Sequence, residues 1–490
     1  MRGRSHLLGL VISACCVLLC AAPVADASLS AEITPPLTVE WVFSMEADPG
    51  NTTTPLILAG GVYVTHKGTL RCLDLRTGAQ RWQFAPEAGK VITSPVGWSS
   101  LVIVGATDSC LYALDALEGR QQWKYLCGGA ISPDPLVVGD LVIAGAEKMV
   151  YALFARSGQA KWYCSLTSGA KAGPATDGSM LYFLCQDGSI QCVDMTLPRY
   201  RWSVAIAHGP STYPPIAGKR GVIAASGKQL FFISRGSGAP RAKEMPAGIG
   251  ASPVVADDSL YVPCVDGQLQ VLYPESGARQ GAAELKVPLA LTAPALVTAK
   301  HAVVGTAGGL VYLLERSSGN MLWSYRCVAP EQLTGEPSEF GIYAPLVSSD
   351  GRLYCLTGAG DLYCFSSSAP DSSGPRFTNL KPESGSAQPG EASVAISFAV
   401  VDDGSGLDTA SLTATVDGAP ARVQFDVVSG AGNLALGKLA DGSHVVRLTA
   451  RDYRGNVGTA EWSFLTDASV TAETETQPGL APRAAPMLGR

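Results

Sequence analysis

Short apolar segments separated by turn residues follow one another along most of this chain, and one of them recurs. It begins with Leu70-Arg71-Cys72-Leu73-Asp74, turns at Gly78 and ends at Trp82. Seven related segments begin at Leu111, Val150, Ile190, Leu230, Leu269, Val311 and Leu362. The first seven of these eight starting positions are 41, 39, 40, 40, 39 and 42 residues apart. A strand repeat with a period of about 40 residues predicts the blades of a β-propeller.

Each repeat divides into four strands. In the second one, Ser94-Pro95-Val96 opens the unit, Leu101–Gly105 and Leu111–Leu114 are apolar strands, and the strand that carries Trp123 closes it. Gly119 precedes this last strand, in a tight turn that requires a positive φ.

A tryptophan recurs on the predicted outer strand of most repeats. At this fixed position a large flat side chain can pack against the next blade, which we favour over stacking against a ligand. Ala242 and Gly281 stand at the equivalent places in the fifth and sixth repeats, so these blades must dock differently and could leave a gap for a partner. The predicted docking residues are Trp41, Trp82, Trp123, Trp162, Trp202 and Trp323.

The two ends of the repeat region predict how the ring closes. The eighth repeat stops at Phe365 without an outer strand, whereas Trp41-Val42-Phe43 precedes the first repeat and resembles that missing strand. Pairing the two segments would remove an exposed edge. We therefore expect an all-β fold with an eight-bladed propeller over residues 35–367, with seven blades as the alternative.

The pattern changes after the propeller. Residues 368–375 are rich in serine, proline and glycine and are interpreted as a linker. Strand patterns at 394–400, 411–416, 444–450 and 461–464 predict a small β-sandwich over residues 376–467. Its Asp-Gly turns resemble those of bacterial immunoglobulin-like modules. The tail, residues 468–490, has the composition of a disordered segment.

Aspartates cluster in the turns of the predicted sandwich. Asp402, Asp403, Asp408 and Asp452 could offer oxygen ligands to Ca²⁺. The alternative is that these Asp-Gly runs only form turns.

Residues 1–27 have the features of a secretory signal: Arg2 and Arg4, an apolar run over residues 7–24, and Ala25-Asp26-Ala27 as the cleavage site. This predicts export to the periplasm, the cell envelope or the extracellular space. An uncleaved membrane anchor and a lipid anchor at Cys15 are the alternatives. No second apolar run of transmembrane length follows. The net charge of −6 without a basic stripe argues against a nucleic-acid partner.

Ten cysteines follow the signal. Cys72, Cys192 and Cys364 share one repeat position and Cys185 and Cys264 share another, as expected of small buried core residues. Free thiols are therefore favoured, with one or two disulfides as the alternative that export would permit.

The repeat Leu73-Asp74-Leu75-Arg76-Thr77-Gly78-Ala79-Gln80-Arg81-Trp82 resembles that of pyrroloquinoline-quinone propeller proteins. That family contains quinoprotein dehydrogenases and non-catalytic scaffolds, including the lipoprotein of the outer-membrane β-barrel assembly machinery. The dehydrogenases generally carry an adjacent cysteine pair near the cofactor, and the only such pair here, Cys15-Cys16, lies in the signal. The resemblance thus implies the fold but leaves the activity open.

We expect a non-enzymatic scaffold that binds envelope or extracellular proteins or polymers through one propeller face, with no cofactor. A dehydrogenase that uses pyrroloquinoline quinone and Ca²⁺ is the alternative. Loops between blades and the inner turns gather on one face, where binding residues concentrate. The alternative is that these loops are exposed to solvent and bind no partner. The candidate binding residues are His208, Ser211, Thr212, Tyr213, Glu331, Glu336, Glu339, Phe340, Tyr343, Asp108, Asp187 and Asp266.

Overall fold

The computed structural model describes residues 29–131, 133–206, 213–281, 283–327, 339–389 and 393–467. The predicted signal (1–27) and the predicted disordered tail (468–490) lie outside these residues. The chain divides between Asp371 and Ser372 into two compact units. The described residues contain no α-helix, and none of them forms a helix long and apolar enough to cross a membrane.

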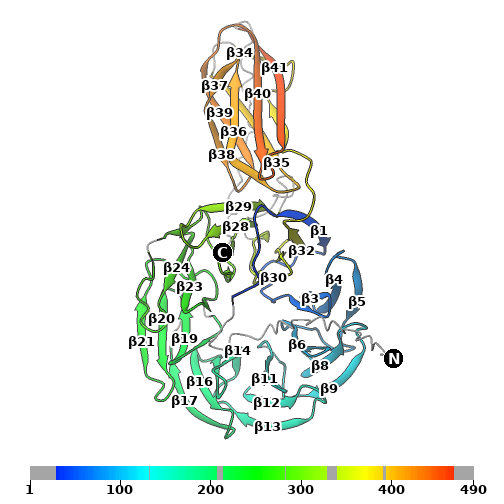
Figure 1. Cartoon of the computed structure of the whole chain (residues 1–490), viewed down its shortest axis with the longest axis vertical. Coiled ribbons are helices and arrows are strands. Elements are labelled where there is room, and N and C mark those ends of the chain that lie inside the picture. Colours follow the sequence, from blue (N-terminus) through cyan, green and yellow to red (C-terminus); the bar gives the residue numbers. More distant parts are fainter. Residues whose placement is uncertain are drawn as a thin grey trace, which may run out of the picture. The chain divides into compact units, whose positions relative to one another are not determined.

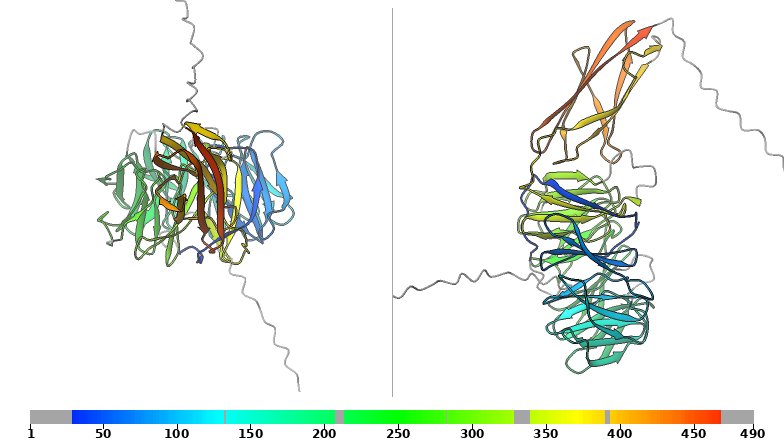
Figure 2. Two further views of the ribbon diagram at one scale, coloured as in Figure 1. Left: turned by 90° about the horizontal axis from the view of Figure 1, so that it is seen from above. Right: turned by 90° about the vertical axis from the view of Figure 1, so that its right-hand side faces the viewer.

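Eight four-stranded antiparallel sheets make up the described part of the first unit, and they follow one another around a ring (Figure 1). We call them blades 1 to 8. The right-hand view of Figure 2 shows the same ring from its side.

Blade 1 contains β2 (Leu56–Leu58), β3 (Gly61–His66), β4 (Thr69–Asp74) and β5 (Gln80–Phe84). Blade 2 contains β6 (Val96–Trp98), β7 (Leu101–Gly105), β8 (Cys110–Asp115) and β9 (Gln121–Leu126). Blade 3 contains β10 (Leu136–Val138), β11 (Leu141–Ala146), β12 (Met149–Phe154) and β13 (Ala160–Ser165). Blade 4 contains β14 (Ala170–Thr176), β15 (Met180–Cys185), β16 (Ser189–Asp194) and β17 (Arg199–Ala205).

Blade 5 contains β18 (Ile216–Gly218), β19 (Gly221–Ser226), β20 (Gln229–Ser234) and β21 (Pro240–Glu244). Blade 6 contains β22 (Val254–Ala256), β23 (Ser259–Pro263), β24 (Gln268–Leu272) and β25 (Leu285–Lys286). Blade 7 contains β26 (Leu296–Val297), β27 (His301–Gly305), β28 (Leu310–Glu315) and β29 (Met321–Arg326). Blade 8 contains β30 (Val347–Ser349), β31 (Arg352–Leu356), β32 (Asp361–Ser366) and β1 (Thr38–Ser44).

The strands of a blade are buried on both faces near the centre of the ring. β3, β11 and β19, each second in its blade, are buried along their whole length because neighbouring blades cover both faces of the sheet. The outer strands alternate instead, as in β9, where Trp123 is buried between exposed neighbours. The core is therefore a set of apolar layers between consecutive blades, such as the cluster shared by blades 2 and 3.

The blade tryptophans connect each sheet to the next one. The indole N–H groups of Trp82, Trp123, Trp202 and Trp323 donate to the carbonyl oxygens of Ala116, Ala155, Arg235 and Leu37, at 3.1, 2.9, 2.9 and 3.0 Å. Trp41 lies against Gly78 of blade 1, and Trp162 is half-buried. Where blade 5 has Ala242 in place of tryptophan, Phe232 contacts the turn glycine Gly277 of blade 6.

β1 closes the ring as the outer strand of blade 8. Trp41 pairs with Cys364 and Ser44 pairs with Asp361. A two-contact ion pair joins Glu40 on β1 to Arg352 on β31, with the Arg352 Nε to Glu40 Oε2 distance at 2.7 Å. The fourth strand of the last blade thus comes from the N-terminal side of the repeats, as Trp41-Val42-Phe43 indicated.

The second unit is a β-sandwich. One sheet contains β33 (Arg376–Lys381), β35 (Ser393–Val401), β39 (Ala431–Lys438) and β38 (Val423–Asp426). The other contains β34 (Ala387–Pro389), β41 (Val457–Asp467), β40 (Gly442–Asp452), β36 (Leu407–Val416) and β37 (Ala419–Ala421). Phe398, Val446 and Trp462 meet in the shared core. The four expected strands correspond to β35, β36, β40 and β41, and the likeness to immunoglobulin-like modules stays a prediction.

The ten cysteines between Cys72 and Cys364 are free thiols, and nine of them are buried. Cys164 on β13 is half-buried. Burial raises the pKa of Cys164 to about 11 and that of Cys127 to about 12.

Candidate binding face and channel

The turn between the second and third strands of each blade lies at the same end as the segment that enters that blade, because antiparallel strands alternate in direction. Backbone hydrogen bonds tie the two together. Thr107 donates to Lys90, Gln186 to Gly169 and Val265 to Gly248, at 2.9, 2.8 and 2.9 Å. We call the surface formed by these turns and entering segments the loop face.

The three aspartates expected on the loop face are engaged within their own turns. Asp108 accepts from the backbone N–H of Cys110 at 3.1 Å and from the hydroxyl of Tyr112 at 2.5 Å. Asp187 accepts from the backbone and the hydroxyl of Ser189, at 3.0 and 2.7 Å. Asp266 accepts from the backbone of Gln268 at 3.1 Å. They belong to blades 2, 4 and 6, and each stabilises one turn.

The other expected face residues fall into two groups. Tyr213 is half-buried and donates from its hydroxyl to the carbonyl of Ile249 at 2.9 Å, which ties two entering segments together. Burial raises the pKa of Tyr213 and of the half-buried Tyr343. Glu339 is exposed and Phe340 is half-buried. His208, Ser211, Thr212, Glu331 and Glu336 lie outside the described residues.

A hydrogen-bonded chain joins the inner ends of blades 1, 2 and 3, and the sequence reasoning missed it. The backbone N–H of Thr54 donates to the hydroxyl of Ser94 at 2.9 Å. Ser94 in turn donates to both carboxylate oxygens of Asp134 from its backbone and its hydroxyl, each at 2.7 Å. The signal that could have found it is the proline that follows each of these residues, directly before an inner strand.

Asp134 is exposed to solvent, although many protein atoms lie around its carboxyl group. This desolvation raises the pKa of its carboxyl, against the lowering effect of the two Ser94 hydrogen bonds. The inner strands of neighbouring blades contact one another, so these positions border the central channel. The same position in blades 4 to 8 carries Gly173, Pro214, Ser252, Ala293 and Ala344.

None of these eight channel positions carries a positive charge. Pyrroloquinoline quinone is a polycarboxylate, and the Asp134 carboxylate would repel it at this place in the channel.

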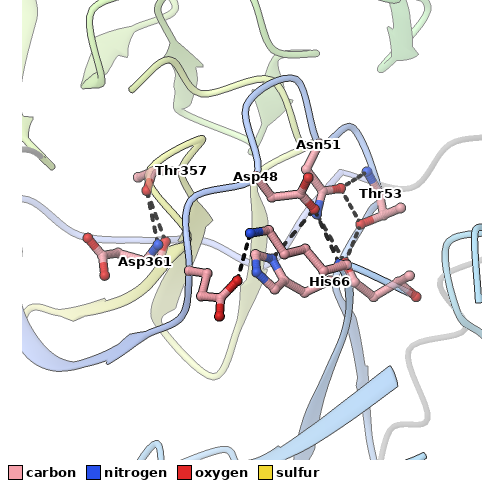
Figure 3. A network of polar contacts seen from close by, with 9 residues as sticks. Asp48, Asn51, Thr53, His66, Thr357 and Asp361 are labelled. Atoms are coloured by element: carbon pink, nitrogen blue, oxygen red, sulfur yellow. Dashed lines mark hydrogen bonds and ion pairs between the residues drawn. The ribbon is translucent and has the colours of Figure 1, made fainter. Parts of the chain in front are cut away.

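A second polar network orders the loop that leads from β1 into blade 1 (Figure 3). Asn51 donates from its side-chain amide to Asp48 at 3.2 Å and to the carbonyl of Thr65 at 3.1 Å. Thr53 donates from its backbone to Asn51 at 2.9 Å. His66 lies below Asp48 and is only 2% exposed, with 3.7 Å between its Nδ1 and the Asp48 carboxylate. Burial lowers the pKa of His66, which keeps the ring neutral near pH 7.

Of the four aspartates considered for Ca²⁺, two lie close together in the sandwich and two have other partners. Asp402 and Asp452 bring carboxylate oxygens within 4.8 Å of each other. Asp402 also accepts from the backbone of Gly406 at 2.7 Å, and Asp452 from that of Asn456 at 2.8 Å. Asp403 is exposed and pairs with Arg376 at 3.3 Å, and Asp408 accepts from the backbone of Ala410 at 3.1 Å. Calcium binding stays a prediction.

The comparison with known families decides the relationship. A family model described as outer membrane protein assembly factor BamB matches residues 38–241 and 186–371. The chain belongs to this family. BamB of Burkholderia pseudomallei is 31% identical over 136 residues, which cover 27% of this chain and 35% of that protein. The quinohemoprotein alcohol dehydrogenase of Comamonas testosteroni is 28% identical over 168 residues, which cover 29% of this chain and 24% of the enzyme.

The chain therefore matches about a third or less of the length of these two relatives. The crystal structure of BamB from Moraxella catarrhalis matches with a TM-score of 0.51 at 19% identity, over 68% of this chain and 99% of that chain. At that identity the likeness establishes the fold of the first unit. The BamB family and the dehydrogenase thus share the propeller, while the chemistry has to be argued from this chain's own residues.

Proposed function

We propose that this chain is an exported, non-enzymatic scaffold of the cell envelope that binds a protein partner through the loop face. Membership of the family described as outer membrane protein assembly factor BamB is the observation that carries the proposal. The hydrogen-bonded turns of the loop face support it, because a surface held in one conformation loses little entropy when a partner binds.

Site-specific photo-cross-linking in the native envelope tests the proposal. A photoreactive residue replaces Ile92 or Glu339, which are exposed on the loop face. Matched controls replace Leu117 or Leu197, which are 60% and 58% exposed in turns between third and fourth strands, at the opposite end of the blades. We expect a discrete protein adduct from the first pair only. Equal labelling from both faces, or no adduct from either, would overturn the assignment to the loop face.

A quinone-dependent dehydrogenase is the second candidate, because the enzyme of Comamonas testosteroni is similar over part of the propeller. The channel residues around Asp134 argue against it. Purified protein mixed with pyrroloquinoline quinone and Ca²⁺ is examined for a bound chromophore and for dye reduction with alcohols or sugars. The scaffold proposal expects neither, and measured turnover would replace it with the enzyme.

A further inference from the structure

One position of the repeat controls how the space between consecutive blades is filled. It is the third residue of the third strand. Five of the eight blades carry an aromatic residue there, whereas blades 1, 4 and 6 carry Arg71, Gln191 and Gln270. The aromatic residues are Tyr112, Tyr151, Phe231, Tyr312 and Tyr363.

At three junctions this aromatic residue packs against the outer strand of the preceding blade, where its partner is the ring two residues after the blade tryptophan. The blades that precede Phe231 and Tyr312 carry Val204 and Ala283 at the partner position. The ring centroids of Phe84 and Tyr112 are 5.1 Å apart, those of Tyr125 and Tyr151 are 5.9 Å apart, and those of Tyr325 and Tyr363 are 6.0 Å apart. Such pairs fill the outer part of the blade junction.

The junction between blades 8 and 1 has only half of this pair. Phe43 on β1 stands two residues after Trp41, but Arg71 occupies the place of its aromatic partner. A groove of about 540 Å³ opens there. It is lined by Phe43, Ser44, Met45, Glu46, His66, Lys67, Thr69, Arg71 and Gln80. We call it the closure groove.

The other two polar substitutions are satisfied differently. Gln191 is fully buried and donates from its side-chain amide to the Thr167 hydroxyl at 2.6 Å, so it fills its own junction. Gln270 lies in a groove of about 440 Å³ between blades 5 and 6, where Ala242 replaces the tryptophan. The cations of that groove have partners: Lys243 donates to the carbonyl of Gly277, and Arg279 pairs with Glu284 at 3.6 Å.

Arg71 in the closure groove retains an unused donor. Its Nη1 is buried and has no hydrogen-bond acceptor among the described residues. The neighbouring charges are already engaged, because Lys67 pairs with Glu46 at 2.8 Å and Asp48 accepts from Asn51. Both ring nitrogens of the buried His66, which also lines the groove, lack a hydrogen-bond partner in the described part of the chain. Leaving buried donors unpaired costs free energy that an incoming acceptor would recover.

We propose that the closure groove binds an acidic segment of a protein partner in which an aromatic side chain lies next to a carboxylate. The ring packs against Phe43 and Met45, in the space that tyrosine fills at other junctions. The carboxylate accepts from Arg71. This inference rests on the proposed function, since the groove includes part of the loop face, namely Met45, Glu46, His66 and Lys67, and it defines the chemistry of a docking site there.

Fluorescence anisotropy with a labelled peptide tests the groove on the full mature chain. The probe is a hexapeptide of alternating phenylalanine and glutamate, and the comparison peptide carries glutamine in place of glutamate. Because the glutamine oxygen accepts from Arg71 without the negative charge of a carboxylate, we expect the glutamine peptide to bind roughly tenfold more weakly. Arg71→Gln should weaken the glutamate peptide by a similar factor, and Arg71→Tyr should abolish its binding by filling the groove.

Gln270→Tyr is the matched control, since it fills the equivalent groove between blades 5 and 6 and should leave binding unchanged. Thermal unfolding of Arg71→Tyr, expected at or above the wild-type midpoint, separates a filled groove from a misfolded protein. Three results would overturn the proposal. The first is equal binding of the glutamate and glutamine peptides, and the second is unchanged binding of the glutamate peptide to Arg71→Tyr. The third is that a peptide with alanine in place of phenylalanine binds as well as the phenylalanine peptide, which would make the groove a general anion site. If these appear while cross-links from Ile92 and Glu339 persist, the scaffold function stands without the groove.

Discussion

At the scale of single residues, a glycine in the outer turn lets the tryptophan of the preceding blade approach, as at Gly78, Gly119, Gly158 and Gly238. Gly119 has a φ of +71°, and a Cβ at this position would lie 2.6 Å from the Trp82 ring. Gly139 also has a positive φ, +62°, but a Cβ there would meet no atom within 4 Å. The two glycines therefore separate backbone strain from loss of packing.

We expect Gly139→Ala to destabilise the protein by about 1 kcal/mol, the cost of a left-handed backbone at a residue with a side chain. Gly119→Ala should cost roughly 2–4 kcal/mol, because the ring of Trp82 must also move. Urea unfolding followed by tryptophan fluorescence measures both. If both variants lost the same free energy of unfolding, the close packing of the Trp82 ring against Gly119 would not contribute to stability.

A second residue-scale prediction concerns pH and the sandwich. His444 donates from Nδ1 to Asp417 and from Nε2 to the carbonyl of Ala440 when protonated, both at 2.7 Å. The Asp417 hydrogen bond raises the pKa of His444, and the same bond lowers that of Asp417. Protonated His444 thus stabilises the folded sandwich below its unfolded-state pKa of about 6.5. This stabilisation is lost as the pH rises through the raised pKa of the folded state.

The ionised Asp417 carboxylate also stabilises the folded sandwich, and this stabilisation is lost when the pH falls through its lowered pKa. We expect calorimetry to show a lower melting temperature of the sandwich transition as the pH rises above about 6.5. Asp417→Asn should flatten this dependence. A slope that persists in the variant would assign it to other groups.

At the scale of elements, much of the propeller could be predicted from regular spacing. Gly119 and Trp123 mark one turn and one outer strand, and Trp41-Val42-Phe43 has the pattern of the strand that the eighth repeat lacks. The channel chain of Thr54, Ser94 and Asp134 could not be predicted, because its members lie 40 residues apart and meet only once the blades are arranged in a ring. The unpaired Arg71 donor could not be predicted either, because only the structure shows that no acceptor among the described residues lies within its reach.

The closing strand leads to an element-scale prediction. A chain that begins at Ala47 lacks β1 and exposes the edge of β32. We expect a melting temperature lower by several degrees and increased binding of a hydrophobic dye, because Trp41 and Phe43 no longer cover blade 8. A peptide of residues 29–46 added in trans should restore the midpoint. Failure of that rescue would mean that the strand acts only when covalently attached.

At the scale of the whole molecule, the thiols report how the ring opens. The nine buried cysteines are distributed over five of the eight blades and the segments between them, whereas Cys164 is half-buried. We expect iodoacetamide to modify Cys164 first and the buried thiols later, at one common rate set by opening of the ring. Mass spectrometry of the digested protein follows each site. Widely different rates among the buried thiols would show that blades open one by one.

Closure by β1 also sets the order in which this protein can be completed. Trp41 emerges among the first residues after the predicted signal, yet its partner Cys364 belongs to the last repeat. During synthesis the first strand has no native partner until seven blades and most of the eighth have followed it. A chain that stops at an earlier repeat therefore has two open sheet edges and cannot close into a smaller ring. The chain therefore forms either a closed propeller or an incomplete one, whose exposed sheet edges make it susceptible to proteolysis.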